Sequence, residues 1–174
     1  MRLVKNATRT IKNGAKFQGI FDVICRRPDN TIRWHEIAHN LITNEGLNHI
    51  LDVVLHGDTP VSPWYVGLKN AGSVAAGDTL ASHAGWTENT NYTGNRQEYV
   101  EAAASAQSIT NSANKAGFPI TVDSQSIAGA FLAAAATGTS GVLFCAADFP
   151  SAKAADNGDT LEVTYTISAA DDGV

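Results

Sequence analysis

The segment 160–168 alternates apolar and polar residues with a period of two. Its apolar positions are Leu161, Val163, Tyr165 and Ile167, and Thr, Glu and Ser residues lie between them. Successive side chains of a strand point to opposite faces, so this pattern predicts a half-buried antiparallel strand. Other short apolar runs, bounded by Asn, Gly, Ser or Asp, predict further strands at 64–70, 105–111, 116–123, 126–134 and 141–149.

A hairpin is predicted near the start of the chain. Residues 17–26 and 31–43 are both rich in β-branched and aromatic side chains, and the sequence RPDN separates them. Pro28 presets its own φ, and Asp29 and Asn30 tolerate the left-handed conformation that turns require. The two runs therefore read as antiparallel neighbours.

One helix is predicted, at about 44–56. Apolar residues recur there at helical spacing, at Leu47, Ile50, Leu51, Val54 and Leu55. Thr43 is suited to cap the N-terminus, Glu45 favours the first turn, and Gly57 is suited to the left-handed position that ends a helix.

Many short strands, one helix and no β-α-β rhythm predict a mainly β fold. We expect an antiparallel β-sandwich, jelly-roll-like, with one short α-helix. The chain has 174 residues, which suits one domain. We assign that domain to residues 17–174. Residues 1–16, with no regular apolar pattern, are expected to form an extended N-terminal arm.

Charge is distributed unevenly along the chain. Residues 1–33 hold eight basic and two acidic residues, whereas residues 34–174 hold four basic and fifteen acidic ones. The arm contains five cations and no acid: Arg2, Lys5, Arg9, Lys12 and Lys16. A basic arm on an acidic body indicates docking onto an acidic surface, and these five residues are the predicted partner-binding set. The arm has no interleaved aromatics and no nucleic-acid-binding motif, so a protein surface is the expected partner rather than nucleic acid.

The two cysteines and the longest apolar run bear on compartment and membrane. Cys25 and Cys145 lie within apolar strand-like runs, which predicts two buried, reduced thiols in a protein synthesised in a cytosol. Residues 127–136 form the longest apolar stretch and are too few to span a bilayer. We expect no membrane association and no cofactor or metal.

Residues 75–98 form a predicted long loop that gathers chemistry-bearing side chains. His83, with Ser82 and with Asp78 or Glu88, has the composition of a nucleophile–base–orienter set. No nucleophile elbow and no HExxH motif accompany it, so we expect no enzymatic activity.

The loop's aromatic residues have two possible roles. Trp86 and Tyr92 are suited either to anchor the loop by burial or to stack on a sugar. His83, Trp86 and Tyr92 are accordingly the candidate anchor or interface residues, with the anchor role favoured.

An ordered series of strings resembles a group of small structural proteins of tailed bacteriophages. The strings are HNLITNEGLNHILDVVL, WYVGLKN, VAAGDTLASHAGWTE and NGDTLEVTYTISAADDGV, and together they run from His39 to Val174. Proteins of this kind look like head decoration, or cement, proteins. Such proteins are β-sandwiches that lock neighbouring major capsid subunits together and are commonly dimeric or trimeric. The resemblance carries no catalytic residues.

The resemblance implies a virion structural protein on the outer capsid surface, made in the host cytoplasm. Its expected partners are the major capsid protein and further copies of itself, as a homodimer or homotrimer, with the arm reaching a neighbouring subunit. The alternative function is a tail-fibre or receptor-binding module that recognises a host glycan through Trp86 and Tyr92.

Overall fold

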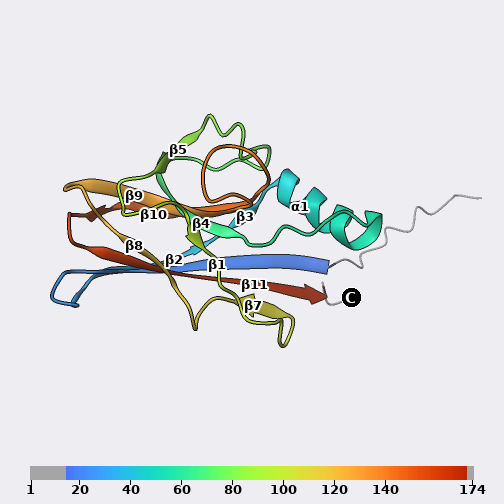
Figure 1. Ribbon diagram of the computed structural model, residues 1–174, viewed down its shortest axis with the longest axis horizontal. Coiled ribbons are helices and arrows are strands. Elements are labelled where there is room, and N and C mark those ends of the chain that lie inside the picture. Colours follow the sequence, from blue (N-terminus) through green and yellow to red (C-terminus); the bar gives the residue numbers. More distant parts are fainter. Residues whose placement is uncertain (1–14, 172–174) are drawn as a thin grey trace, which may run out of the picture.

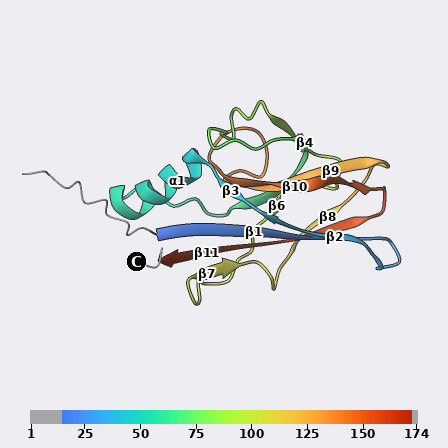
Figure 2. The same ribbon diagram turned by 180° about the vertical axis from the view of Figure 1, so that it is seen from behind.

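Two antiparallel sheets face each other in the computed structural model, which describes residues 15–171 (Figures 1 and 2). The first is five-stranded, in the order β2-β1-β11-β7, with β8 also paired to β11. Its strands are β1 (Ala15–Arg26), β2 (Ile32–His39), β7 (Ser108–Thr110), β8 (Ala116–Pro119) and β11 (Thr160–Asp171). The predicted antiparallel β-sandwich is confirmed.

The second sheet has six strands in the order β3-β10-β9-β4-β5, and β6 also pairs with β4. Its strands are β3 (Leu41–Ile42), β4 (Tyr65–Gly72), β5 (Trp86–Asn89), β6 (Gln97–Glu98), β9 (Gln125–Ala133) and β10 (Leu143–Ala155). Every pairing in both sheets is antiparallel. No helix among residues 15–171 is long and apolar enough to cross a bilayer.

The predicted hairpin at the start of the domain is β1 and β2, joined by a turn over residues 27–31. Asn30 has a φ of 66°, and the backbone N–H of Arg27 donates to the carbonyl of Thr31 at 2.9 Å. The Asp29 carboxylate accepts from the Thr31 N–H and hydroxyl. The turn chemistry of Asp29 and Asn30 therefore acts as the sequence predicted.

The main core lies between the two sheets. On β11 the alternation places Leu161, Val163 and Tyr165 fully inside, and Phe21 of β1 stacks on Tyr165 with ring centroids 4.4 Å apart. Phe118 of β8 adds to the same side of the core. Facing side chains come from β4, β9 and β10 of the second sheet, and include Val66, Leu68, Ile127, Leu132 and Phe149. Burial of this apolar surface is the main force that holds the sheets together.

The predicted helical segment is α1 (Asn44–Leu51) followed by one π-helical turn, η1 (Asp52–His56). The Thr43 side chain accepts from the Gly46 N–H, and Gly57 ends the segment at a φ of 79°. A Cβ at Gly46 would collide with the backbone carbonyl of Phe144, so glycine lets the helix rest directly on β10.

The apolar stripe of this segment is not turned into the core. Ile50 packs partly against the core, but the rest of the stripe is exposed to solvent: Leu47, Leu51, Val54 and Leu55. Helical periodicity reveals which residues share a side of the helix, and it does not reveal what that side faces.

The boundary of the predicted N-terminal arm shifts by two residues. β1 begins at Ala15, and Lys16 pairs with Ala170 of β11, so Lys16 belongs to a strand. The other four predicted arm cations lie outside the described residues: Arg2, Lys5, Arg9 and Lys12.

Candidate functional site

The connection after β4 crosses the outer face of the six-stranded sheet and then joins that sheet through β5 and β6. We call residues 73–98 the covering segment (Figure 1). Although a strandless loop was predicted for 75–98, the segment contains β5 and β6, both of which pair with β4. A second apolar cluster fills the space beneath it, made of Leu80, Trp86, Phe131, Ala133, Leu143 and Ala146.

The covering segment explains why β9 reads as a continuous apolar run. Ala130 and Leu132 of β9 face the main core, whereas Phe131 and Ala133 face the covering segment. A strand that is buried on both faces loses the alternation expected of a half-buried one.

Trp86, near the middle of the covering segment, fixes the segment to β9. Only 3% of its surface is exposed, and its ring lies 5.2 Å from that of Phe131. The indole Nε1–H donates to the Asp78 carboxylate at 2.9 Å, and the His83 ring stacks on the indole at 4.0 Å. The polar edge of Trp86 is thus satisfied within the segment while its apolar face packs on β9.

Tyr92 anchors the far part of the same segment to the main core. It is buried, its ring makes an edge contact with Phe118 at 4.8 Å, and its backbone forms a bridge with Ile120. Burial raises the pKa of the Tyr92 hydroxyl, with a smaller contribution from the negative charge of Glu88. Neither Trp86 nor Tyr92 offers a free ring face on which a sugar would stack.

A buried ion pair under the covering segment was not anticipated from the sequence. The Lys69 side chain on β4 is fully buried, with Nζ 2.5 Å from the Asp148 carboxylate and 2.9 Å from the carbonyl of Gly72. The other Asp148 oxygen accepts from the Val74 N–H, and Nζ also lies 5.8 Å from the Trp86 ring centroid. The sequence signal was a lysine inside the otherwise apolar run WYVGLKN.

Arg96 and Glu88 fix the end of the covering segment. The guanidinium makes a two-pronged contact with the carboxylate at 2.9 and 2.8 Å, and also donates to the carbonyls of Ala135 and Gly138. Its side chain is almost fully buried and lies over the Phe131 ring at 5.2 Å. The planar guanidinium donates to four acceptor oxygens at once, which the single ammonium group of a lysine would not do in this geometry.

The side chains of the loop that could resemble a catalytic set are not assembled into one. His83 Nδ1 lies 3.1 Å from the backbone carbonyl of Trp86. Asp78 accepts from Trp86 and from the Ala75 N–H, and Glu88 is engaged by Arg96. Each group with potential for acid–base chemistry is thus engaged by a structural partner.

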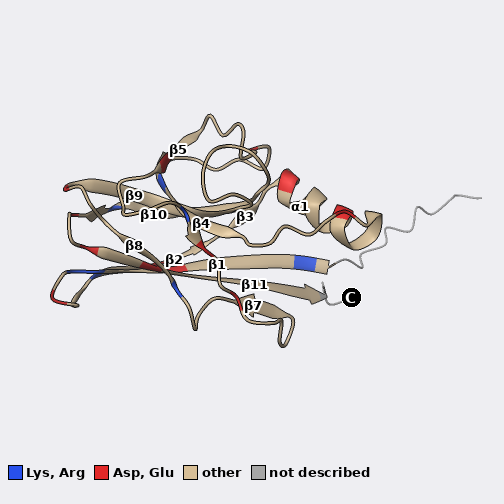
Figure 3. Cartoon of the chain, viewed as in Figure 1, with Lys and Arg blue, Asp and Glu red and all other residues tan. Residues whose placement is uncertain are grey.

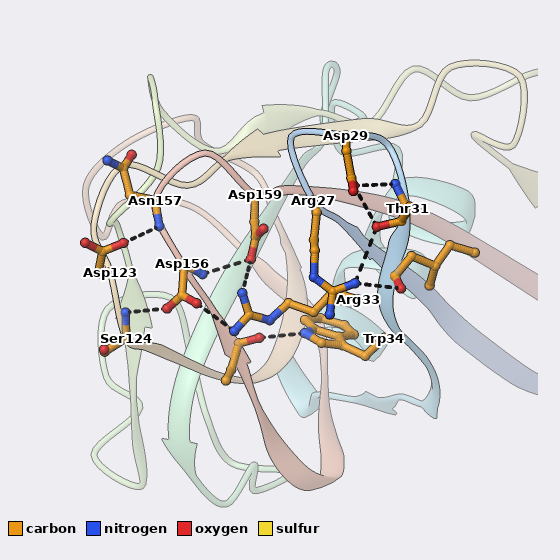
Figure 4. A network of polar contacts seen from close by, with 12 residues as sticks. Arg27, Asp29, Thr31, Arg33, Trp34, Asp123, Ser124, Asp156, Asn157 and Asp159 are labelled. Atoms are coloured by element: carbon orange, nitrogen blue, oxygen red, sulfur yellow. Dashed lines mark hydrogen bonds and ion pairs between the residues drawn. The ribbon is translucent and has the colours of Figure 1, made fainter.

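At the hairpin end, a polar network joins three turns (Figure 4). Arg33 of β2 contacts Asp156 at 2.6 Å and Asp159 at 2.8 Å, both in the β10–β11 turn. Asp156 also accepts from the Ser124 N–H in the β8–β9 turn, and these contacts hold the pKa of its carboxyl below the usual value. Trp34 donates to the carbonyl of Ala154 at 2.7 Å. The charged and polar side chains at this end therefore bind one another and hold the three turns together.

The two cysteines are buried and unbonded, as predicted. Cys25 lies on β1 and Cys145 on β10. Burial raises the pKa of each thiol to about 12, so both are protonated at neutral pH and are poor nucleophiles. Within residues 15–171 no three His, Cys, Asp or Glu side chains gather closely enough to hold a metal ion.

Comparison with known protein families gives one informative match. Residues 41–168 match the family described as Podophage GP4 fiber I protein gp80. The matched range includes the helical segment, the covering segment, every strand of the second sheet and most of β11. It leaves out β1 and β2. No curated protein matches the chain.

Proposed function

The chain belongs to the podophage GP4 fiber I protein gp80 family, and on that premise we propose that it builds part of a fibre on a phage particle. Membership makes it a bacteriophage structural protein associated with the virion. The fibre role is favoured over head decoration because the family description names a fibre.

We propose that the protein acts without catalysis, as a rigid module. Support comes from the side chains that first suggested chemistry. His83 and Asp78 hold Trp86, Glu88 holds Arg96, and both thiols are buried and protonated. Buried polar groups that all have partners make a structure rigid.

Decoration of the outer capsid surface, with the major capsid protein as partner, is the second candidate. The observation in its favour is the charge pattern, a basic start of the chain before an acidic body. A cement protein would use such a segment to bridge neighbouring subunits of a repeating shell. The candidates differ in place, since a fibre occupies a few positions and a decoration protein covers the head. Electron microscopy of labelled particles distinguishes them.

Recognition of a host glycan through Trp86 and Tyr92 is not favoured for this fibre role. Both rings are buried against Phe131 and Phe118 respectively, so sugar stacking would require each to leave its packed position. A receptor contact by this chain would have to use other side chains.

We expect the four cations at the start of the chain to contribute to attachment. In the full-length chain, replacing Arg2, Lys5, Arg9 and Lys12 by glutamine is predicted to weaken binding to particles that lack the protein by roughly 4-fold or more, at about 0.2–1 kcal/mol per surface charge. The measurement is the amount that co-sediments with the particles at low and moderate salt. The charge effect should shrink as salt rises.

A matched control removes exposed cations from the body instead. Arg27→Gln with Lys115→Gln changes exposed charge near the end of β1 that is opposite Ala15, and is expected to leave co-sedimentation unchanged. Equal binding by the four-fold variant and the wild-type protein would show that the basic segment has no role in attachment.

A further inference from the structure

A pocket with a volume of about 340 Å³ opens between the two sheets, and much of its wall is aromatic. Four rings line it, those of Trp64, Phe144, Tyr99 and Tyr165. Glu101 is the only charged residue among the described residues of the lining. The pocket has about twice the volume of the roughly 150 Å³ cavity that holds a benzene molecule, so it has room for a small organic ligand.

The four rings are held in place by contacts with one another and with the backbone. Trp64 meets Phe144 edge-on with ring centroids 5.3 Å apart, and Tyr99 meets Tyr165 edge-on at 5.7 Å. The Tyr99 backbone N–H donates to the carbonyl of Trp64 at 2.8 Å, and the Tyr99 hydroxyl donates to the carbonyl of Tyr165 at 3.1 Å. The His49 ring of α1 lies 5.5 Å from the Trp64 ring, so the pocket lies next to the helical segment. Walls that are fixed in this way need little rearrangement to receive a ligand.

The walls offer few hydrogen-bond acceptors to a ligand. The Tyr99 hydroxyl is engaged as described, and the Tyr165 hydroxyl lies 2.9 Å from the side-chain amide of Asn40, which donates to it. The remaining polar side chains of the described lining are those of Ser62 and Glu101. A primary ammonium or a guanidinium has several N–H donors, each of which needs an acceptor when buried. A quaternary ammonium has no N–H, so it loses no hydrogen bond in such a pocket.

Glu101 supplies a negative charge at the rim of the pocket. Its side chain is exposed, its backbone N–H donates to the carbonyl of Tyr99 at 3.2 Å, and the N–H of Ala102 donates to the carbonyl of Thr110 at 3.1 Å. Within residues 15–171 its carboxylate forms no ion pair. Burial raises the pKa of the Tyr99 hydroxyl, and the negative charge of Glu101 raises it further. The carboxylate therefore acts on the interior of the pocket.

The charges at this end of the sandwich also favour a cation. Figure 3 shows acidic positions on the helical segment and a basic position at the start of β1. The basic residue is Lys16, an odd number of positions along β1 from the buried Phe21. Because successive strand residues point to opposite faces, Lys16 points away from the core and from the space between the sheets. It therefore does not oppose a cation in the pocket.

We propose that this pocket binds a quaternary ammonium group, such as the trimethylammonium group of choline. The faces of aromatic rings carry negative potential and attract such a cation, more strongly where water is excluded. Its methyl groups pack against the apolar walls, and Glu101 balances its charge from the rim. The inference goes beyond the fibre role and concerns purified protein, so its failure would leave the place of the protein on the virion untouched.

The test is titration calorimetry of the full-length chain with choline at constant ionic strength. We expect a dissociation constant of about 1 mM or tighter. The matched probe is dimethylbutanol, in which carbon replaces the nitrogen of choline and the shape is kept, and we expect it to bind roughly 10-fold more weakly. Phosphocholine distinguishes two sources of the group. Binding as tight as that of choline indicates a headgroup carried on a phosphate, and weaker binding indicates the free cation.

A substitution at the rim tests the part played by charge. Glu101→Gln changes an exposed side chain, and we expect it to weaken choline binding by roughly 3-fold and to leave dimethylbutanol binding unchanged. The control is Glu98→Gln, which removes an exposed carboxylate of β6 that does not line the pocket and should leave choline binding unchanged.

Three results would overturn the proposal. The first is no detectable binding of choline at about 10 mM. The second is dimethylbutanol binding as tight as that of choline, because the pocket would then select shape and not charge. The third is an equal effect of Glu101→Gln and Glu98→Gln on choline binding, including no effect of either, because the rim carboxylate would then have no specific role.

Discussion

Replacing Trp86 by alanine is expected to lower the free energy of unfolding by about 3–5 kcal/mol, the usual cost of removing a large buried aromatic side chain. The indole fills the space between the covering segment and Phe131, supports the His83 ring and carries the hydrogen bond to Asp78. Urea unfolding at neutral pH measures the loss. In the Trp86→Ala variant, hydrogen exchange of the backbone amides should speed up more in residues 73–98 than in β1 and β11, each compared with the wild-type protein.

The control for this change is Trp86→Phe, which keeps an aromatic ring but loses the Nε1–H donor. We expect a smaller loss, about 1–3 kcal/mol, because Asp78 loses a partner while most apolar packing remains. A loss below about 1 kcal/mol for Trp86→Ala would contradict the structural role given to this ring, since buried large-to-small changes rarely cost so little.

Removing the partner of the buried lysine is expected to have the second-largest effect. Asp148→Ala leaves the ammonium of Lys69 inside the protein with only the Gly72 carbonyl and the Trp86 ring nearby. Breaking a buried pair costs about 3–5 kcal/mol. Because Asp148 is 40% exposed, we expect a smaller loss than this range, about 2–3 kcal/mol, measured as the free energy of unfolding in urea.

The matched variant removes the charge rather than its partner. Lys69→Met keeps a similar volume and leaves Asp148 partly in solvent, so the expected change in the free energy of unfolding is within about 1 kcal/mol. Lys69→Met combined with Asp148→Ala should recover most of the loss caused by Asp148→Ala alone. A double variant as unstable as Asp148→Ala would show that Asp148 acts through the Val74 N–H instead of through Lys69.

Local patterns in the sequence were sufficient to predict the sandwich and its hairpin. Leu161, Val163 and Tyr165 alternate with polar residues and are fully buried, while Asp29 and Asn30 form the turn assigned to them. These features depend on neighbours along the chain, through the pleat of a strand and the side-chain hydrogen bonds of a turn.

Features set by contacts between distant segments were not predictable in the same way. The pairing of β5 with β4 depends on segments that the pattern does not relate, so the covering segment was expected to lack strands. The pairing of Lys69 with Asp148 joins β4 to β10, 79 residues apart. The helical stripe was visible in the sequence, but its exposure depends on where the helix rests, which Gly46 and Phe144 decide.

The chemistry-bearing residues of the loop show the same limit. Composition alone gathers His83, Asp78 and Glu88 in one stretch, and such stretches also occur in active sites. The structure divides them between two anchoring contacts, one at Trp86 and one at Arg96. The structure buries Trp86 and Tyr92, which the sequence marked as candidate anchor or interface residues, so folding is the property that we expect to respond to their substitution.

The place of the protein on the virion tests the central claim most directly. Gold-labelled antibodies raised against the purified protein, applied to intact particles, report that place in the electron microscope. The fibre proposal predicts gold confined to the few positions from which fibres project, with unlabelled heads. Gold spread evenly over the head surface would contradict it and would favour capsid decoration.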